Sequence, residues 1–362
     1  MLDNLTIIII TYQRYSFLKR LLSFHLSYNS KVKYIVLDSS EDYPEDKHLL
    51  EMLSSKQVTW KRFPSDIFFL KKIAQGCELA NTDYLVLSPD DDFLIPTALQ
   101  ECLNFLKLNK DYSSAHGLSF SHHSYKKGQD LDLSITPFHN GKCLSLEQDS
   151  ALERINLYMT DTNFPYYPMY AIHHKEDFCF MWQESEKYVD SQGLSELLPC
   201  CLSLMKGKMK VLPNFYNLRQ PNNFNGWDDK ETLSKVYSQK RVHQASLGLA
   251  KNINQDNYLS LKESRVFSNE VFDKYLKHLY KKLEKAVKSN SSLTGFFSDL
   301  RQRLGIRTKI RNIINKIFYK GSHHLVYPKY ISDFEKVKKN IIDFDLTFEE
   351  LNQARRKIEY PE

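Results

Sequence analysis

Residues 83–96 read DYLVLSPDDDFLIP. An apolar run from Tyr84 to Leu87 ends in a polar turn with three consecutive aspartates, and a proline opens the next segment. A short apolar run bounded by turn residues is typical of a buried strand, and proline is common in the first turn of a helix. The stretch therefore predicts a buried strand, an acidic turn and a helix over residues 96–108.

The residues before this stretch repeat the same alternation. The sequence predicts strands at 5–11, 33–37, 57–63 and 83–87, and helices at 16–27, 45–54, 69–80 and 96–108. Strands separated by helices of this length form right-handed βαβ units around a mostly parallel sheet. Ligands of such sheets bind beyond the carboxyl ends of the strands. Three polar loops are expected there, at residues 11–14, 38–40 and 90–92.

The remaining chain divides into an irregular middle and a helical end. In the middle we expect strands at 114–121, 168–173 and 208–212, and a helix over 193–206 closed by Gly207 in a left-handed conformation. From about residue 226 onward the pattern is helical. The predicted organisation is one domain over residues 1–225, with a nucleotide-binding half (about 1–110) and an acceptor half (about 111–225). A basic, mainly helical C-terminal region follows at 226–362.

The acidic turn is the motif that carries chemistry. Three adjacent carboxylates, Asp90, Asp91 and Asp92, repel one another unless a cation lies among them. Hard oxygen ligands select Mg²⁺ or Mn²⁺, and these ions bridge diphosphates. A metal beside a nucleotide diphosphate neutralises the leaving group as a glycosidic bond breaks. The alternative is a solvated turn that caps the following helix, because aspartate is favourable at a helix N-terminus.

Composition and cysteine usage suit a cytoplasmic protein. Of the 362 residues, 42% are hydrophobic, enough for a sizeable core. The early apolar run Ile7–Ile10 is too short for a signal peptide or a membrane span and suits a buried strand. The six cysteines contain no CxxC pair, which indicates free thiols in a reducing compartment.

Positive charge is concentrated near the C-terminus. Residues 274–320 carry 13 Lys and Arg against 2 Asp and Glu, a local charge of +11, so the rest of the chain carries −5. This asymmetry suggests an anionic partner. Within it, residues 301–320 place isoleucines at helical spacing between basic residues. Such a helix lies either in an anionic membrane interface, making the protein peripheral on the inner face of the membrane, or on the protein's own core with its basic face in water.

Several of these motifs together resemble the GT-A glycosyltransferases. They are IIIITYQR at 7–14, the strand ending at Asp38, Gly76 followed by ANTDY at 80–84, and LSPDDDFLIP at 87–96. The closest group is the large inverting family that contains the catalytic domains of cellulose and hyaluronan synthases. The resemblance covers residues 3–110 and extends more loosely to about 220. It implies an α/β GT-A fold, a nucleotide-sugar donor, an acceptor hydroxyl, inversion, and Mn²⁺ or Mg²⁺ as cofactor.

The resemblance also implies roles for individual residues. Thr11, Tyr12 and Arg14 match the loop that meets base and ribose, Asp38 matches an acid that holds base or ribose, and Lys72 lies near a basic residue that faces base or phosphate. Asp90, Asp91 and Asp92 match the DxD region. Asp92 is its expected direct metal ligand, with Asp90 as the second. One departure is Pro89, which stands where the family commonly has aspartate. Lys72 has a plainer interpretation as a solvated helix charge.

An inverting transferase also needs a general base for the acceptor hydroxyl. In the family an acidic pair opens a helix that ends in Lys-Gly-Lys. Here Ser195 and Glu196 precede such a helix, so Glu196 is the expected base and Asp190 the fallback. Glu196 as an ordinary first-turn helix acid is the alternative. Arg219 matches a region where the family has a basic residue near the diphosphate.

The expected setting is polysaccharide or lipid-linked glycan assembly, with a glycan or lipid-linked glycan as acceptor. The rival hypothesis is a nucleic-acid- or membrane-binding protein that uses the basic C-terminal region on an inactive GT-A scaffold. The sequence contains no recognised nucleic-acid motif, so no nucleic-acid partner is expected. A nucleotidyltransferase would carry a Gly-rich phosphate loop near its start, where this chain has Thr-Tyr-Gln-Arg.

Overall fold

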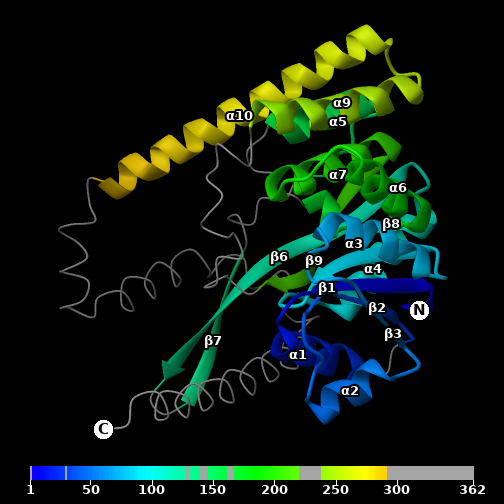
Figure 1. The fold of residues 1–362 in the computed structure, drawn as a ribbon, viewed down its shortest axis with the longest axis vertical. Helices are drawn as coiled ribbons and strands as arrows, with labels where there is room; N and C mark the ends of the chain where they lie inside the picture. Colours follow the sequence, from blue (N-terminus) through cyan, green and yellow to red (C-terminus); the bar gives the residue numbers. More distant parts are fainter. Residues whose placement is uncertain are drawn as a thin grey trace.

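A nine-stranded sheet forms the centre of the computed structural model, which describes residues 2–28, 31–127, 130–137, 145–160, 167–219 and 238–291. The strand order is β3-β2-β1-β4-β8-β6-β9-β5, with β7 paired to β6 (Figure 1). The strands are β1 (Leu5–Thr11), β2 (Lys33–Asp38), β3 (Val58–Arg62), β4 (Tyr84–Pro89), β5 (Phe93–Leu94), β6 (Tyr112–Lys127), β7 (Asp130–Pro137), β8 (Ile172–His174) and β9 (Lys208–Arg219).

The first half of the sheet is parallel, as the alternating sequence pattern predicts. β1 pairs in parallel with β2 and β4, and β2 pairs in parallel with β3. The connecting helices are α1 (Tyr15–Leu26), α2 (Lys47–Leu53) and α3 (Phe69–Gly76), and α4 (Pro96–Leu108) follows β4 and β5. Because β1 is covered on both faces, its isoleucines at positions 7, 8 and 9 are fully buried. The prediction of an α/β fold with a mostly parallel sheet is confirmed.

The second half of the sheet is mixed. β8 is antiparallel to β4 and β6, whereas β6 and β9 run parallel. The two-residue strand β5 pairs with the end of β9, so that Phe93 lies opposite Leu218. This pairing brings the acidic turn next to Arg219, more than a hundred residues later in the chain. β9 extends seven residues beyond the predicted strand end, and it is this extension that reaches the site.

Two apolar clusters hold helices on opposite faces of the sheet (Figure 1). One contains α1, α2 and α4. The other contains α3, α5 (Ala151–Thr160), α6 (Lys175–Glu186), α7 (Gln192–Lys206), α9 (Gln239–Gln255) and part of α10 (Leu261–Ser291). α5 and α6 are not predicted from the sequence, although the buried positions of α5 (151, 154, 155, 158 and 159) follow a helical period. The five cysteines within the described residues are free thiols.

Two glycines allow close approach of neighbouring segments. A Cβ on Gly76 would lie 2.4 Å from Leu37 Cδ1, so glycine here lets α3 pack directly on β2. Gly207 does not adopt the predicted left-handed conformation, because its φ is 177°. It is needed for a different reason: a Cβ there would lie 2.7 Å from the backbone nitrogen of Ser113. α7 therefore passes into β9 through an extended glycine pressed against β6.

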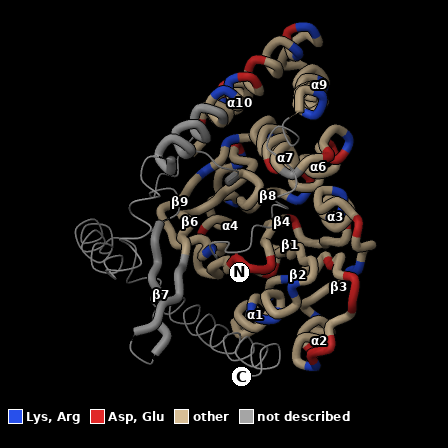
Figure 2. Tube along the Cα trace, turned by 60° about the vertical axis from the view of Figure 1, so that its left-hand side comes forward, with Lys and Arg blue, Asp and Glu red and all other residues tan. Residues whose placement is uncertain are grey.

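The C-terminal helices are part of the same folded body. Ala245, Leu249 and Ile253 of α9 and Val271 and Phe272 of α10 are buried in the cluster that also contains α7. Figure 1 shows α9 and α10 outside α6 and α7, on the side away from the sheet. The described part of α10 carries both signs of charge (Figure 2). The predicted amphipathic helix at 301–320 lies outside the described residues. None of the described helices is long and apolar enough to cross a membrane.

Three buried histidines make the fold sensitive to acid. Burial lowers the pKa of His25 and His116 to about 3 and that of His173 to about 4. Between these values and the unfolded pKa near 6.5, the unfolded chain binds more protons, so stability falls as the pH drops. We expect each histidine to remove about 1–2 kcal/mol between pH 7 and about pH 5. In urea unfolding, His25→Phe should lessen this loss, whereas His48→Gln at an exposed position should not. An unchanged pH dependence in His25→Phe would contradict this account.

Candidate active site

The acidic turn lies at the carboxyl end of β4, between β4 and β5. Asp90, Asp91 and Asp92 are 3%, 6% and 3% exposed. The following helix α4 has Ile95 at its N-cap and no side-chain capping hydrogen bond. The turn is therefore neither solvated nor a helix cap, and its three carboxylates point to another use.

Arginines from distant segments neutralise these carboxylates. Arg14 Nη1 lies 3.3 Å from Asp90 Oδ1, and Arg14 Nη2 lies 2.6 Å from Asp91 Oδ2. Arg219 Nε donates to Asp92 Oδ2 at 3.0 Å. The Thr11 hydroxyl donates to Asp90 Oδ2 at 2.7 Å. Burial, together with the neighbouring Asp91, raises the pKa of Asp90 to about 7, although Arg14 opposes the shift. The ends of β1, β4 and β9 thus meet in one charged cluster.

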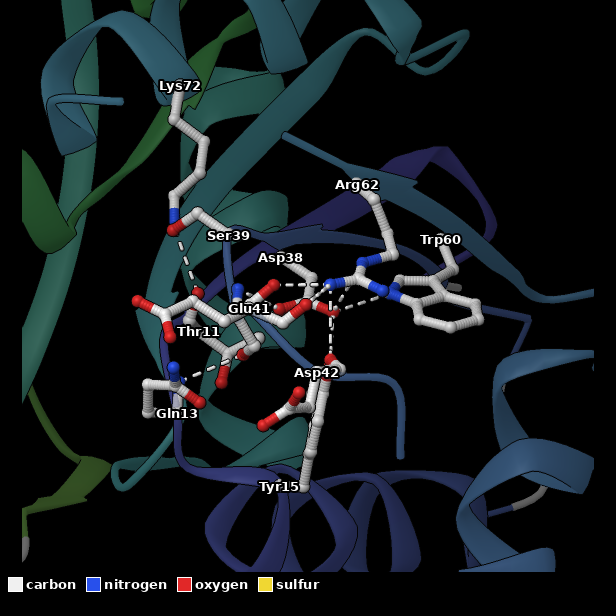
Figure 3. A network of polar contacts seen from close by, with 11 residues as sticks. Thr11, Gln13, Tyr15, Asp38, Ser39, Glu41, Asp42, Trp60, Arg62 and Lys72 are labelled. Carbon is white, nitrogen blue, oxygen red and sulfur yellow. Dashed lines mark hydrogen bonds and ion pairs between the residues drawn. The ribbon is translucent and has the colours of Figure 1, made fainter. Parts of the chain in front are cut away.

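The loops after β1 and β2 form a second polar region beside this cluster (Figure 3). Gln13 adopts a left-handed backbone conformation with φ of 55°, and its N–H donates to Ser40 Oγ at 2.9 Å. Ser39 N–H donates to the carbonyl oxygen of Thr11 at 3.3 Å. Asp38 is fully buried beneath this contact, whereas Tyr12 is 49% exposed and presents a ring that a planar ligand can stack on.

The Lys72 side chain connects the loops that follow β1 and β2. Its ammonium donates to the carbonyl oxygen of Thr11 at 2.9 Å and to Ser39 Oγ at 2.8 Å. The side chain is buried, which excludes the interpretation as a solvated helix charge. Burial lowers the pKa of Lys72 to about 8, against the effect of the nearby Asp38 and Asp90.

Glu196 lies near Arg219, in the second turn of α7. Because α7 begins at Gln192 and has no acidic residue in its first turn, the interpretation of Glu196 as an ordinary first-turn helix acid is wrong. Burial raises the pKa of Glu196 to about 7, and Arg219 opposes this shift. The Tyr170 ring packs under the Arg219 guanidinium, whose carbon lies 5.3 Å from the ring centroid. The negative charges of Glu196 and Asp92 also act electrostatically on the Tyr170 hydroxyl. A carboxylate that stays protonated until about neutral pH, close to a cationic and acidic cluster, is suited to proton transfer.

Asp190, the fallback base, lies in a different environment. Its side chain is 70% exposed and pairs with Arg241 of α9 at 3.1 Å. The structure thus brings together Thr11, Arg14, Asp90, Asp91, Asp92, Glu196 and Arg219, and leaves Asp190 at the surface beside α9.

The arrangement of three strand ends around an acidic turn agrees with the sequence comparison. Residues 6–167 match the model of Glycosyl transferase family 2. This chain is a glycosyltransferase that resembles family 2 over these residues. No curated protein matches the sequence.

Two solved structures support the glycosyltransferase fold over nearly the whole chain. The crystal structure of S. aureus TarS 1-349 is 11% identical, with 96% of this chain and 91% of that chain covered and a TM-score of 0.50. The same protein in complex with UDP-GlcNAc is 13% identical, with 96% and 92% covered and a TM-score of 0.50. The shared fold includes the C-terminal helices, since residues well beyond the family model are covered.

Three residues of the candidate site, Tyr15, Trp60 and Arg62, have no signal in the sequence, and Tyr170 stands out only as one of several aromatic residues between 164 and 182 that could stack on a sugar. Tyr15, Trp60 and Arg62 surround Asp38, and Tyr170 supports Arg219. In the structure, half-buried Trp60 and Arg62 lie on one face of β3 and exposed Lys61 on the other, but the adjacent charges at 61 and 62 hide this alternation in the sequence.

Replacing Lys72 with methionine should destabilise this glycosyltransferase. The change removes the Lys72 donor from the Ser39 hydroxyl and one of the two donors to the Thr11 carbonyl, at a cost of about 1–3 kcal/mol in the free energy of unfolding. Urea unfolding at neutral pH measures it. Lys71→Met, one residue away and exposed, is the matched control and should lie within about 0.5 kcal/mol of the parent protein. Equal stabilities for the two variants would contradict the bridging role of Lys72.

Proposed function

We propose that this protein transfers a sugar from a nucleotide-sugar donor to an acceptor hydroxyl with inversion, and that the donor diphosphate binds at the acidic turn. The observation that carries the proposal is the shared position of Arg219, which contacts Asp92 and acts electrostatically on Glu196. The Arg219 guanidinium therefore acts on two groups at once. One is Asp92, on the side of the leaving diphosphate, and the other is Glu196, the expected base.

The residues of the turn suit a divalent cation held jointly with the donor. Within the described residues no group of three His, Cys, Asp or Glu side chains is arranged to hold a metal ion. Mg²⁺ ordinarily uses one or two carboxylates and completes its shell with water and substrate phosphates. We propose Asp92 and Asp90 as these carboxylates, for Mg²⁺ or Mn²⁺. When bound, the ion would neutralise charge on the leaving diphosphate.

The chain's own groups would perform the remaining steps. Glu196 takes the proton of the acceptor hydroxyl, whose oxygen attacks the anomeric carbon as the bond to the diphosphate breaks. Attack from the side opposite the leaving group inverts the anomeric centre. The positive groups that would contact the diphosphate are Arg219 and Arg14, and Asp91 pairs with Arg14. Thr11, Tyr12, Asp38 and Lys72 shape the pocket for base and ribose.

UDP-GlcNAc is the first donor to test, because the TarS protein of similar fold was crystallised with it. For the acceptor we propose a glycan or lipid-linked glycan, in polysaccharide or lipid-linked glycan assembly. The basic segment 301–320 would then meet the anionic surface that carries such an acceptor.

A thermal-shift screen tests the donor site. The purified protein is heated with UDP-, GDP-, dTDP- and CMP-linked nucleotides, each with and without Mn²⁺. A ligand that binds only the folded state raises the unfolding midpoint. We expect one nucleotide to raise the midpoint in a metal-dependent way. Equal midpoints across the whole panel would contradict the proposed donor site.

A further inference from the structure

The Asp38 carboxylate is already surrounded by donors from the protein. Ser40 N–H donates to Oδ1 at 2.8 Å, and Trp60 Nε1 donates to Oδ2 at 3.2 Å. The Tyr15 hydroxyl lies 2.9 Å from Oδ2, and Arg62 Nε lies 3.7 Å from the same oxygen. A carboxylate has about four acceptor sites. Trp60 and Tyr15 use both sites of Oδ2, Ser40 uses one site of Oδ1, and Arg62 adds an ion pair. The residue is 0% exposed, and a bound nucleotide would have to displace one of these partners to reach it.

Arg62 uses its other atoms to fix the loop that follows Asp38. One guanidinium nitrogen contacts the carbonyl oxygen of Ser40 and lies 3.1 Å from those of Glu41 and Asp42. The guanidinium carbon lies 3.9 Å above the Tyr43 ring. Residues 40–42 lie outside the described strands, and Arg62 donates to their carbonyls in place of a strand partner. The Asp42 carbonyl also accepts from the Tyr15 hydroxyl at 2.6 Å. Nη2 makes all of these carbonyl contacts while Nε faces Asp38, so two nitrogens of one planar guanidinium are used at once, which a single ammonium cannot reproduce.

The fixed loop faces the first loop of the site (Figure 3). Ser40 Oγ accepts from Gln13 N–H, and Ser39 contacts both Thr11 and Lys72. Thr11 in turn donates to Asp90. A continuous series of contacts therefore runs from Arg62 through residues 39–40 to the acidic turn.

We propose that Asp38 is the buried anchor of a clamp centred on Arg62, and that Arg62 is a positioning residue that sets donor affinity by fixing residues 39–43 against the first loop. This inference rests on the proposed function for its donor, and it assigns the base-reading contacts to groups other than the Asp38 carboxylate.

Donor kinetics test the clamp at saturating acceptor, with UDP-GlcNAc and the other nucleotides of the thermal-shift panel. In Arg62→Ala we expect the donor KM to rise about ten- to a hundredfold with kcat within about threefold, because the pocket is loosened while the reacting groups stay in place. Arg62→Lys should restore little, since the fork is lost. Lys61→Ala, the exposed neighbour on the same strand, should match the parent protein. Unchanged KM in Arg62→Ala would overturn the proposal.

The variant Asp38→Asn distinguishes two roles for Asp38: a buried anchor of the clamp, or a residue that contacts the nucleotide base directly. If Asp38 anchors the clamp, this variant and Arg62→Ala lose affinity for all nucleotides by similar factors, and the preference between nucleotides is kept. If Asp38 reads the base, Asp38→Asn alone changes that preference, which would overturn the proposal.

Amide hydrogen exchange gives a readout that needs no donor. Exchange over residues 39–43 should be faster in Arg62→Ala than in the parent protein and in Lys61→Ala. Faster exchange without any nucleotide binding in the parent would count against the proposed function and leave the clamp standing. Unchanged exchange would overturn the clamp whatever the donor.

Discussion

Glu196→Gln is expected to lower kcat about a thousandfold while leaving donor affinity nearly unchanged, because the amide cannot accept the acceptor's proton. Glutamine matches the shape of glutamate, so the packing of α7 should be kept. Steady-state kinetics with the donor identified by thermal shift measure kcat, and the thermal shift itself measures donor binding. The two readouts separate loss of the base from loss of the site.

Asp190→Asn is the matched control for this experiment. Its side chain is exposed and paired with Arg241, so its replacement should change kcat by less than about threefold. The reverse pattern, with Asp190→Asn inactive and Glu196→Gln active, would assign the base to Asp190 and refute the role given to Glu196.

The pH dependence follows from the same residue. Since burial raises the pKa of Glu196 to about 7, the side chain is protonated below that pH and cannot act as a base. The rate should therefore rise with pH through about 7 and level off above it. In Glu196→Gln the residual rate should lose this limb of the pH profile, that is, it should no longer rise with pH through about 7. A limb that persists unchanged in the variant would belong to another group.

Asp92→Asn is expected to reduce kcat/KM about 10²- to 10³-fold and to abolish the metal-dependent part of donor binding. The variant removes the proposed metal ligand and leaves the Arg219 guanidinium without the carboxylate that it contacts at 3.0 Å. Steady-state kinetics measure kcat/KM, and calorimetric titration of the donor nucleotide with and without Mn²⁺ measures the metal-dependent part of binding. The titration is made at a temperature at which Asp92→Asn is folded, because loss of a partly buried ion pair also lowers the free energy of unfolding.

Asp66→Asn, at an exposed aspartate outside the site, controls for the general effect of removing a negative charge. It should bind donor and metal like the parent protein. Donor binding that depends on Mn²⁺ equally in the parent and in Asp92→Asn would show that the metal is held elsewhere, and would remove Asp92 from the proposed mechanism.

Much of the first half of the chain follows from local pattern. The strands β1, β2 and β4 are short apolar runs bounded by polar turns, and the rule that strand ends face ligands places Thr11, Asp38 and Asp90 on one edge of the sheet. The register of β5 with β9 could not be predicted, because a two-residue strand has no periodicity. For this reason the contact between Arg219 and Asp92 emerges only from the structure.

Side chains that bond to backbone carbonyls are also invisible to sequence patterns. Arg62 looks like an ordinary strand charge, and Lys72 stands out only through the resemblance, yet both donate to loop carbonyls at the candidate site. Their importance depends on which loop lies within reach, and that is decided by tertiary packing. Glu196, by contrast, is singled out from the sequence through the resemblance, because it precedes a helix that ends in Lys-Gly-Lys, and its role as base stays a prediction.

The burial of α9 against α7 bears on how the protein can be divided. Leu249 and Ile253 are fully buried against helices that precede residue 225. A chain shortened to residues 1–225 would leave this apolar surface in water and should aggregate or be digested by protease. Shortening the chain after α10 keeps that surface covered, so recombinant work aimed at the transfer reaction should begin from there.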